Sequence, residues 1–132
     1  MPASFDDGGG GGSEGAQGRD AEVDASLCPT DALDTADGPV PIEFWHAMTA
    51  SNEETLNQMV ADYNAGQDVV EVTAVFTGSY DETLDRYLTG LRSGELPQLA
   101  QLEETTLQTM IDSGSTVPAA ACVAASDYDT SD

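Results

Sequence analysis

The sequence from residue 40 onward predicts an α/β fold in which parallel strands alternate with helices. Two apolar runs, 40–46 and 69–76, are rich in β-branched or aromatic residues and have the composition of strands. Each run is followed by a stretch whose apolar residues recur at helical spacing, and each stretch begins with a serine and a glutamate three residues apart. We therefore expect the order β-α-β-α-β-α and a parallel sheet with helices packed on it.

The first strand and helix are expected over 40–46 and 51–66. Pro41 lies at the beginning of the strand, where a missing N–H is tolerated. Ser51 and Glu54 form the pattern of a capping box at the start of the helix. The inward face of this helix is expected to consist of Leu56, Met59, Val60 and Tyr63.

The remaining elements follow in the same order. The second strand ends before Gly78, and Ser79 and Glu82 predict a second capping box. Its helix repeats the apolar spacing with Leu84, Tyr87, Leu88 and Leu91, and it ends by Gly94. A short third strand is expected over 99–102, followed by a helix over 103–113. The inward residues of this last helix are expected to be Leu107, Met110 and Ile111.

Composition divides the chain into two parts. We expect residues 1–37 to form a disordered Gly/Asp-rich tether, because this part is acidic, contains the glycine run 8–12 and has few apolar residues to bury. Residues 38–132 are expected to hold the folded part. Three Lys+Arg against 25 Asp+Glu give a net charge of −22. This charge excludes nucleic acid as a partner, because the phosphates would be repelled.

Motifs of catalysis and cofactor binding are absent from the sequence. No glycine pattern for a nucleotide occurs, and no G-x-S-x-G elbow presents a serine nucleophile. One histidine, His46, and two distant cysteines do not have the spacing of zinc ligands. We therefore expect a protein that is not an enzyme and that holds no cofactor and no metal.

Polar side chains follow each of the three expected strands at its carboxyl end. His46 follows the first strand, Tyr80 the second, and Glu103 and Glu104 the third. Because ligands bind beyond the carboxyl ends of open parallel sheets, these four residues are candidates for a small-ligand cleft. Three of them have a structural alternative: a hydrogen bond for His46, packing at a helix start for Tyr80, and a favourable helix-dipole position for Glu104. Trp45 is expected in the core.

Five motifs in this region, taken together, resemble the family 1 extracellular solute-binding proteins of ABC importers, in particular their glycerol-3-phosphate-binding members. The segment 41–48 has the pattern apolar-x-Phe-Trp-His-x-Met, and the first helix ends with Tyr63-Asn64-Ala65. Gly78-Ser79-Tyr80 matches a Gly-x-Tyr motif. The other two motifs are Ser93-Gly94-Glu95-Leu96-Pro97 and Gln101-Leu102-Glu103-Glu104. The resemblance covers roughly residues 40–118.

The resemblance implies the first part of the N-terminal lobe of a periplasmic-binding-protein-like type II fold over 38–132, truncated before its second lobe. It implies that Tyr80 and Glu104 contact the ligand. Glu103 stands where relatives often have an aromatic residue. The ligand therefore stays open between glycerol-3-phosphate, a glycerophosphodiester, a sugar, a polyol and a choline-type headgroup. Alternatives are a small α/β interaction domain without a ligand and a non-functional fragment.

An extracytoplasmic location follows from the same resemblance. It implies a monomer that delivers a small-molecule solute to the permease subunits of an importer. The protein would lie in the periplasm or on the outer face of the cytoplasmic membrane, where a lipid anchor on an upstream cysteine would fit the tether. Because disulfides form outside the cytoplasm, we expect Cys28 to pair with Cys122; two free thiols are the alternative.

Overall fold

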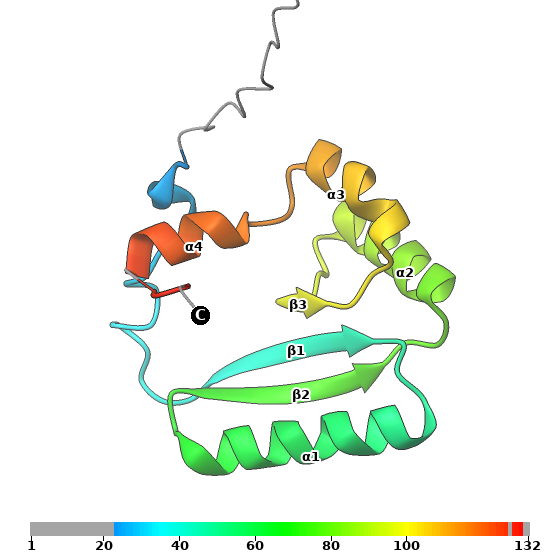
Figure 1. Cartoon of the computed structure of the whole chain (residues 1–132), viewed down its shortest axis with the longest axis horizontal. Helices are drawn as coiled ribbons and strands as arrows, with labels where there is room; N and C mark the ends of the chain where they lie inside the picture. Colours follow the sequence, from blue (N-terminus) through cyan, green and yellow to red (C-terminus); the bar gives the residue numbers. More distant parts are fainter. Residues whose placement is uncertain (1–22, 127, 131–132) are drawn as a thin grey trace, which may run out of the picture.

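The computed structural model describes residues 23–126 and 128–130 and contains a three-stranded parallel sheet with helices on both faces (Figure 1). The strands are β1 (Val40–His46), β2 (Val70–Phe76) and β3 (Leu99–Ala100), in the order β2-β1-β3. Strand β1 pairs with β2 over its whole length, from Val40 opposite Val70 to His46 opposite Phe76. The predicted α/β class and parallel sheet are confirmed.

Two helices connect the strands. Helix α1 (Ala50–Gly66) joins β1 to β2, and α2 (Tyr80–Ser93) joins β2 to β3. Because the two crossovers run in opposite directions along the sheet and such crossovers are right-handed, α1 and α2 lie on opposite faces. The side chains of β1 alternate accordingly, with Ile42 and Phe44 towards α1 and Trp45 towards α2.

The core lies on the α2 face. Trp45 is 4% exposed and packs with Tyr87 of α2 and Met110 of α3 (Leu107–Ser113). The Arg86 guanidinium lies over the Trp45 ring, 4.0 Å from its centroid, which adds a cation–π contact to the burial. Trp45 is therefore a core residue, as predicted.

Several predictions about the helices are wrong. Met59 and Tyr63, expected on the inward face of α1, are 63% and 53% exposed. Helix α1 begins after Thr49, which makes no side-chain capping bond, so Ser51 and Glu54 do not form a capping box. The helix begins at Ala50, one residue earlier than expected, and Ala50 has a φ of 52°. In the third helix only Met110 is buried, whereas Leu107 and Ile111 are more than half exposed.

The elements after α2 also have other boundaries than the sequence predicts. The third strand is shorter than expected, and the predicted helix over 103–113 is divided into the 3-10 helix η2 (Glu104–Thr106) and α3. A further helix, α4 (Ala119–Ser126), was not predicted. Its sequence is mainly alanine, so it has no apolar stripe that a periodicity argument could detect.

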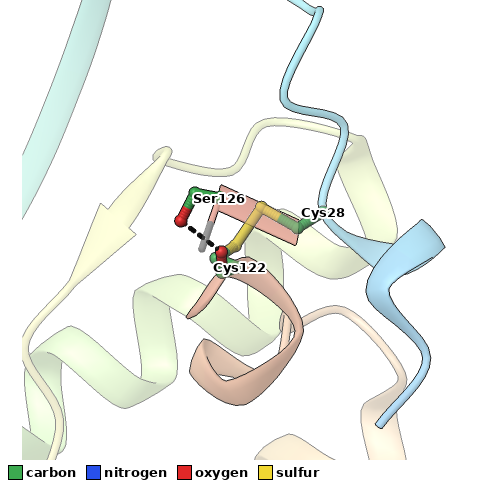
Figure 2. The surroundings of a disulfide bond; sticks show 3 residues. All are labelled: Cys28, Cys122 and Ser126. Atoms are coloured by element: carbon green, nitrogen blue, oxygen red, sulfur yellow. Dashed lines mark hydrogen bonds between the residues drawn. A yellow bond between two sulfur atoms is a disulfide. The ribbon is translucent and has the colours of Figure 1, made fainter. Parts of the chain in front are cut away.

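Cys28 and Cys122 form a disulfide, with Cα atoms 5.0 Å apart (Figure 2). The predicted disulfide is therefore present. It joins α4 to the segment around the 3-10 helix η1 (Ala25–Leu27), and Ser126 Oγ donates a hydrogen bond to the Cys122 carbonyl at 2.7 Å within α4. The predicted tether covers 1–37, of which residues 1–22 lie outside the described residues.

Candidate functional site

The structure brings three of the four candidate ligand residues together. Tyr80, Glu103 and Glu104 line one pocket of about 360 Å³, with Leu102 and Thr105 completing its wall. Tyr80 begins α2, and the two glutamates lie in the connection from β3 to η2. This pocket lies at the carboxyl end of the sheet, where parallel α/β folds bind ligands.

Tyr80 is positioned by a tight turn and a complete capping box. Gly78 has φ 96°, and a Cβ there would clash with the carboxylate of Glu82. Ser79 N–H donates to Glu82 Oε2 at 2.7 Å, and Glu82 N–H donates to Ser79 Oγ at 3.3 Å. Hydrogen bonding to the carboxyl from Ser79, first from its backbone and then from its side chain, lowers the pKa of Glu82. The second predicted capping box is confirmed.

A pair of threonines, Thr83 fully buried and Thr77 half-buried, attaches this turn to the end of β1. Thr83 is fully buried and its hydroxyl donates to the Ser79 carbonyl at 2.9 Å. The hydroxyls of Thr83 and Thr77 lie 2.6 Å apart. Because the Thr83 proton is used on Ser79, the Thr77 hydroxyl donates to Thr83 Oγ1, and the Thr77 N–H donates to the His46 carbonyl at 3.0 Å. The start of α2, and with it Tyr80, is therefore held to β1 by a continuous set of hydrogen bonds.

Gln101, directly after β3, is hydrogen-bonded to the segments that follow β1 and β2 at this end of the sheet. Its N–H donates to the Trp45 carbonyl at 2.8 Å, and its side-chain carbonyl accepts from Ala47 N–H at 3.1 Å. Its side-chain amide donates to Tyr80 Oη at 3.4 Å. Gln101 was noted in the sequence only as part of a motif; its spacing from Ala47 and Tyr80 carried no signal of this role.

The two glutamates are exposed at the mouth of the pocket. Glu103 precedes η2 and its carbonyl accepts from Thr106 N–H and Oγ1 at 3.0 and 2.7 Å, which fixes the turn. Glu104 is the first residue of η2. Tyr80 is 39% exposed, so its ring and hydroxyl are available beside both carboxylates.

Among the residues that the structure describes, no lysine or arginine lines this pocket. Arg86, one of the described cations, is an exposed residue of α2 whose guanidinium lies over the ring of the buried Trp45. Carboxylates accept hydrogen bonds from hydroxyls, and a phenol both donates and accepts. A hydroxyl-bearing ligand therefore fits this wall better than a phosphate, which would face two negative charges.

His46 lies outside this pocket. It is 1% exposed, and its ring centroid is 6.0 Å from that of Phe44 and 5.9 Å from that of Phe76. Its Nδ1 has no hydrogen-bond partner among the described residues. Alternation along β1 directs His46 to the α1 face of the sheet, away from the core around Trp45. The structure thus places it between two phenylalanine rings rather than beside Tyr80.

Neither a metal cluster nor a membrane-spanning helix is found in the part of the chain that the structure describes. Across 23–126 and 128–130, no three His, Cys, Asp or Glu side chains are grouped so that they could hold a metal ion. Within the same ranges no helix combines the length and the apolar character needed to cross a membrane.

Comparison with known proteins identifies relatives that cover the strand–helix region. The chain is 34% identical over 86 residues to the sn-glycerol-3-phosphate-binding periplasmic protein UgpB of Rhizobium meliloti (strain 1021), covering 64% of this chain and 20% of that protein. It is 31% identical over 80 residues to the protein of the same name from Brucella abortus (strain 2308), covering 60% of this chain and 18% of that protein. These binding proteins are homologues of the chain. No protein-family model matches it.

A solved structure agrees with this homology. The cyclic alpha-maltosyl-1,6-maltose binding protein from Arthrobacter globiformis superposes with a TM-score of 0.55 and 27% identity, over 59% of this chain and 20% of that one. The resemblance to solute-binding proteins is therefore confirmed in both sequence and fold. These relatives are named as binding proteins rather than enzymes, and the UgpB relatives are named as periplasmic. The chain spans about a fifth of their length.

Proposed function

We propose that this chain is part of the solute-binding component of an ABC importer and supplies one wall of the cleft that captures a small polar solute. The observation that carries the proposal is the pocket formed by Tyr80, Glu103 and Glu104 at the carboxyl end of the sheet. It lies in a chain whose homologues are named for binding glycerol-3-phosphate and whose structural neighbour is named for binding a maltosyl sugar.

The chemistry of the wall favours the hydroxyl-bearing part of such a solute. Carboxylate oxygens of Glu103 and Glu104 accept from hydroxyls, and Tyr80 offers a ring for stacking and a phenol for hydrogen bonding. A sugar or polyol satisfies all three groups. With glycerol-3-phosphate or a glycerophosphodiester, the glycerol hydroxyls would occupy this wall and the phosphate would contact cations elsewhere in the complete protein.

The same proposal places the protein outside the cytoplasm, with permease subunits of an importer as its partners. The Cys28–Cys122 disulfide supports an oxidising compartment. A lipid anchor and a monomeric state are further parts of the proposal, and cell fractionation with sedimentation analysis of the purified protein would test both. We propose a binding role without catalysis, because the relatives are named as binding proteins rather than enzymes.

NMR titration of the isotope-labelled chain tests the binding proposal, because it detects the weak binding expected from half of a cleft. The probes are maltose, glycerol, sn-glycerol-3-phosphate and inorganic phosphate. We expect chemical shifts of Tyr80, Glu103 and Glu104 to change with the hydroxyl-bearing probes and not with inorganic phosphate. The Glu104→Gln and Tyr80→Ala variants should weaken these changes.

Two control variants remove a charge or a ring at positions that do not line the pocket. Glu54→Gln alters an exposed carboxylate of α1, and Tyr128→Ala removes an exposed tyrosine near the described C-terminal end. Both should leave the titrations unchanged. If no probe shifts the pocket residues at tens of millimolar, the proposal fails for this wall, and an interaction domain without a ligand or a non-functional fragment becomes the better explanation.

A further inference from the structure

The side-chain amides of two residues at the end of α1 are hydrogen-bonded to the backbone of β2. Asn64 donates to the Val72 carbonyl at 2.8 Å and accepts from Val72 N–H at 2.9 Å. Gln67, directly after α1, donates to the Val70 carbonyl at 2.8 Å and accepts from the N–H groups of Val69 and Val70 at 2.8 and 2.9 Å. Two side chains thus satisfy both polar backbone groups of Val70 and of Val72.

These bonds lie on the outer edge of the sheet. In the part of the chain that the structure describes, the strand order is β2-β1-β3, so β1 pairs with one edge of β2 and the other edge ends the sheet (Figure 1). Val70 and Val72 are alternate residues, whose N–H and C=O groups point to the same edge of a parallel strand. An exposed row of such groups is a template for pairing with another chain.

The composition of β2 makes an open edge hazardous. The strand contains three valines, a threonine and a phenylalanine, which favour extended backbone, and its single charged residue is Glu71. It contains neither proline nor lysine, the residues that commonly blunt an edge. The net charge of −22 repels a second copy, but salt at about 0.15 M already screens charges separated by more than about 8 Å. Protection of this edge therefore needs a local device.

We propose that Asn64 and Gln67 close the outer edge of β2 against strand addition, so that a second copy of the chain cannot extend the sheet there. A primary amide carries both a donor and an acceptor, so it replaces a peptide group of a neighbouring strand, which neither a carboxylate nor an ammonium group can do. Both side chains are half-buried, and the last turn of α1 brings Asn64 alongside the edge. This role does not depend on the proposed ligand.

A double variant, Asn64→Ala/Gln67→Ala, opens the edge and tests the proposal. Gln58→Ala/Gln108→Ala is the matched control, because it removes two exposed amides that bond to aspartates within their own helices. Sedimentation velocity of the 132-residue chain is measured in dilute buffer and at about 1 M NaCl, where the Debye length is about 3 Å. At the higher salt we expect the double variant to form dimers or larger species as its concentration rises. The parent and the control should keep the mass of one chain.

Amide exchange locates the association on the molecule. In the dilute double variant, the amides of Val70 and Val72 should exchange faster than in the parent. They should regain protection as association proceeds, because the added strand supplies carbonyl acceptors. Association that leaves these two amides unprotected would overturn the proposal. So would a folded double variant that stays monomeric at the higher salt, or a control that associates equally.

A milder variant and its rescue keep the test decisive if circular dichroism shows that the double variant is unfolded. Asn64→Ala alone leaves Gln67 to hold the start of β2. Adding Val72→Pro removes the N–H that Asn64 satisfies in the parent, and proline is tolerated on edge strands. We expect Asn64→Ala to associate at the higher salt and Asn64→Ala/Val72→Pro to remain monomeric. Equal behaviour of these two variants would overturn the proposal.

Discussion

Gln101 Nε2 lies 3.4 Å from Tyr80 Oη, and the other side-chain atom of the same amide, Oε1, accepts from Ala47 N–H at 3.1 Å. One side chain thus joins the connection after β1 to the first residue of α2. Tyr80 is a candidate ligand residue, and Gln101 is a positioning residue for it. The geometry of the candidate site depends on this amide as much as on the groups that face the ligand.

Replacing Gln101 by alanine should therefore destabilise the fold and release Tyr80. Loss of both side-chain hydrogen bonds, with the Ala47 N–H left without its partner, should cost about 1–3 kcal/mol. Urea unfolding measures the loss, and NMR should show the Tyr80 ring signals moving. Gln108→Ala is the control, because Gln108 makes only an exposed bond to Asp112 within α3. Equal losses in the two variants would contradict the proposed role of Gln101.

The turn before Tyr80 should require glycine at position 78. Gly78→Ala introduces a Cβ at φ 96° against the Glu82 carboxylate, so both the turn and the capping box are disturbed. We expect a loss of about 2 kcal/mol or more, from backbone strain and a broken cap. Gly66→Ala is the control, since a Cβ there meets no atom within 4 Å and its φ is not positive. A Gly78→Ala variant as stable as the parent would contradict this account.

The capping box of α2 should also produce a pH dependence. Hydrogen bonds from Ser79 lower the pKa of the Glu82 carboxyl in the folded state, so the unfolded state binds its proton more readily. The contribution of this carboxylate to the free energy of unfolding is fully present above the ordinary glutamate pKa. It is lost as the pH falls through the lowered pKa of Glu82 in the folded state. The parent should therefore lose its advantage over Glu82→Gln between about pH 5 and pH 3. Thermal unfolding across that range measures the difference.

Glu54→Gln is the matched control for that experiment. Glu54 belongs to the capping pattern that does not form, and the N-cap of α1 makes no side-chain bond. The stability difference between parent and Glu54→Gln should therefore vary little over the same pH range. A pH dependence as large as that of Glu82→Gln would mean that general charge repulsion, rather than the capping box, governs the acid response.

The Asn64 side chain forms hydrogen bonds with the outer edge of β2. Its side-chain amide donates to the Val72 carbonyl at 2.8 Å and accepts from Val72 N–H at 2.9 Å, as a neighbouring strand would. Asn64→Ala should cost about 1–3 kcal/mol in urea unfolding and should speed amide exchange at Val72. Gln58→Ala, which removes an exposed bond to Asp62, should cost less than about 0.5 kcal/mol. Unchanged exchange at Val72 would contradict the prediction.

The elements that periodicity predicted well are those that bury a face. Strand β1 and helix α2 have the expected bounds, and α2 turns Tyr87 into the core. Ser51 and Glu54 do not form the predicted capping box because the helix begins at Ala50, so Thr49 and not Ser51 is the N-cap. The sequence could predict that Tyr80 and Glu104 lie close together, because the carboxyl ends of parallel strands lie at the same edge of a sheet. It could not predict the role of Gln101, since that role depends on the register between β1 and β3.

The disulfide should stabilise one corner of the molecule more than the sheet. It closes a sequence separation of 94 residues, for which the loop-entropy model gives about 4–5 kcal/mol. Helix α4 packs chiefly against η1, so the Cys28→Ser/Cys122→Ser double variant should release both. In the double variant, amide exchange should become much faster across 119–126 and should change little across 70–76. Non-reducing mass measurement after alkylation checks the bond itself: the parent should gain no alkyl groups until it is reduced. Equal loss of protection in both segments would show instead that the bond stabilises the whole domain as one unit.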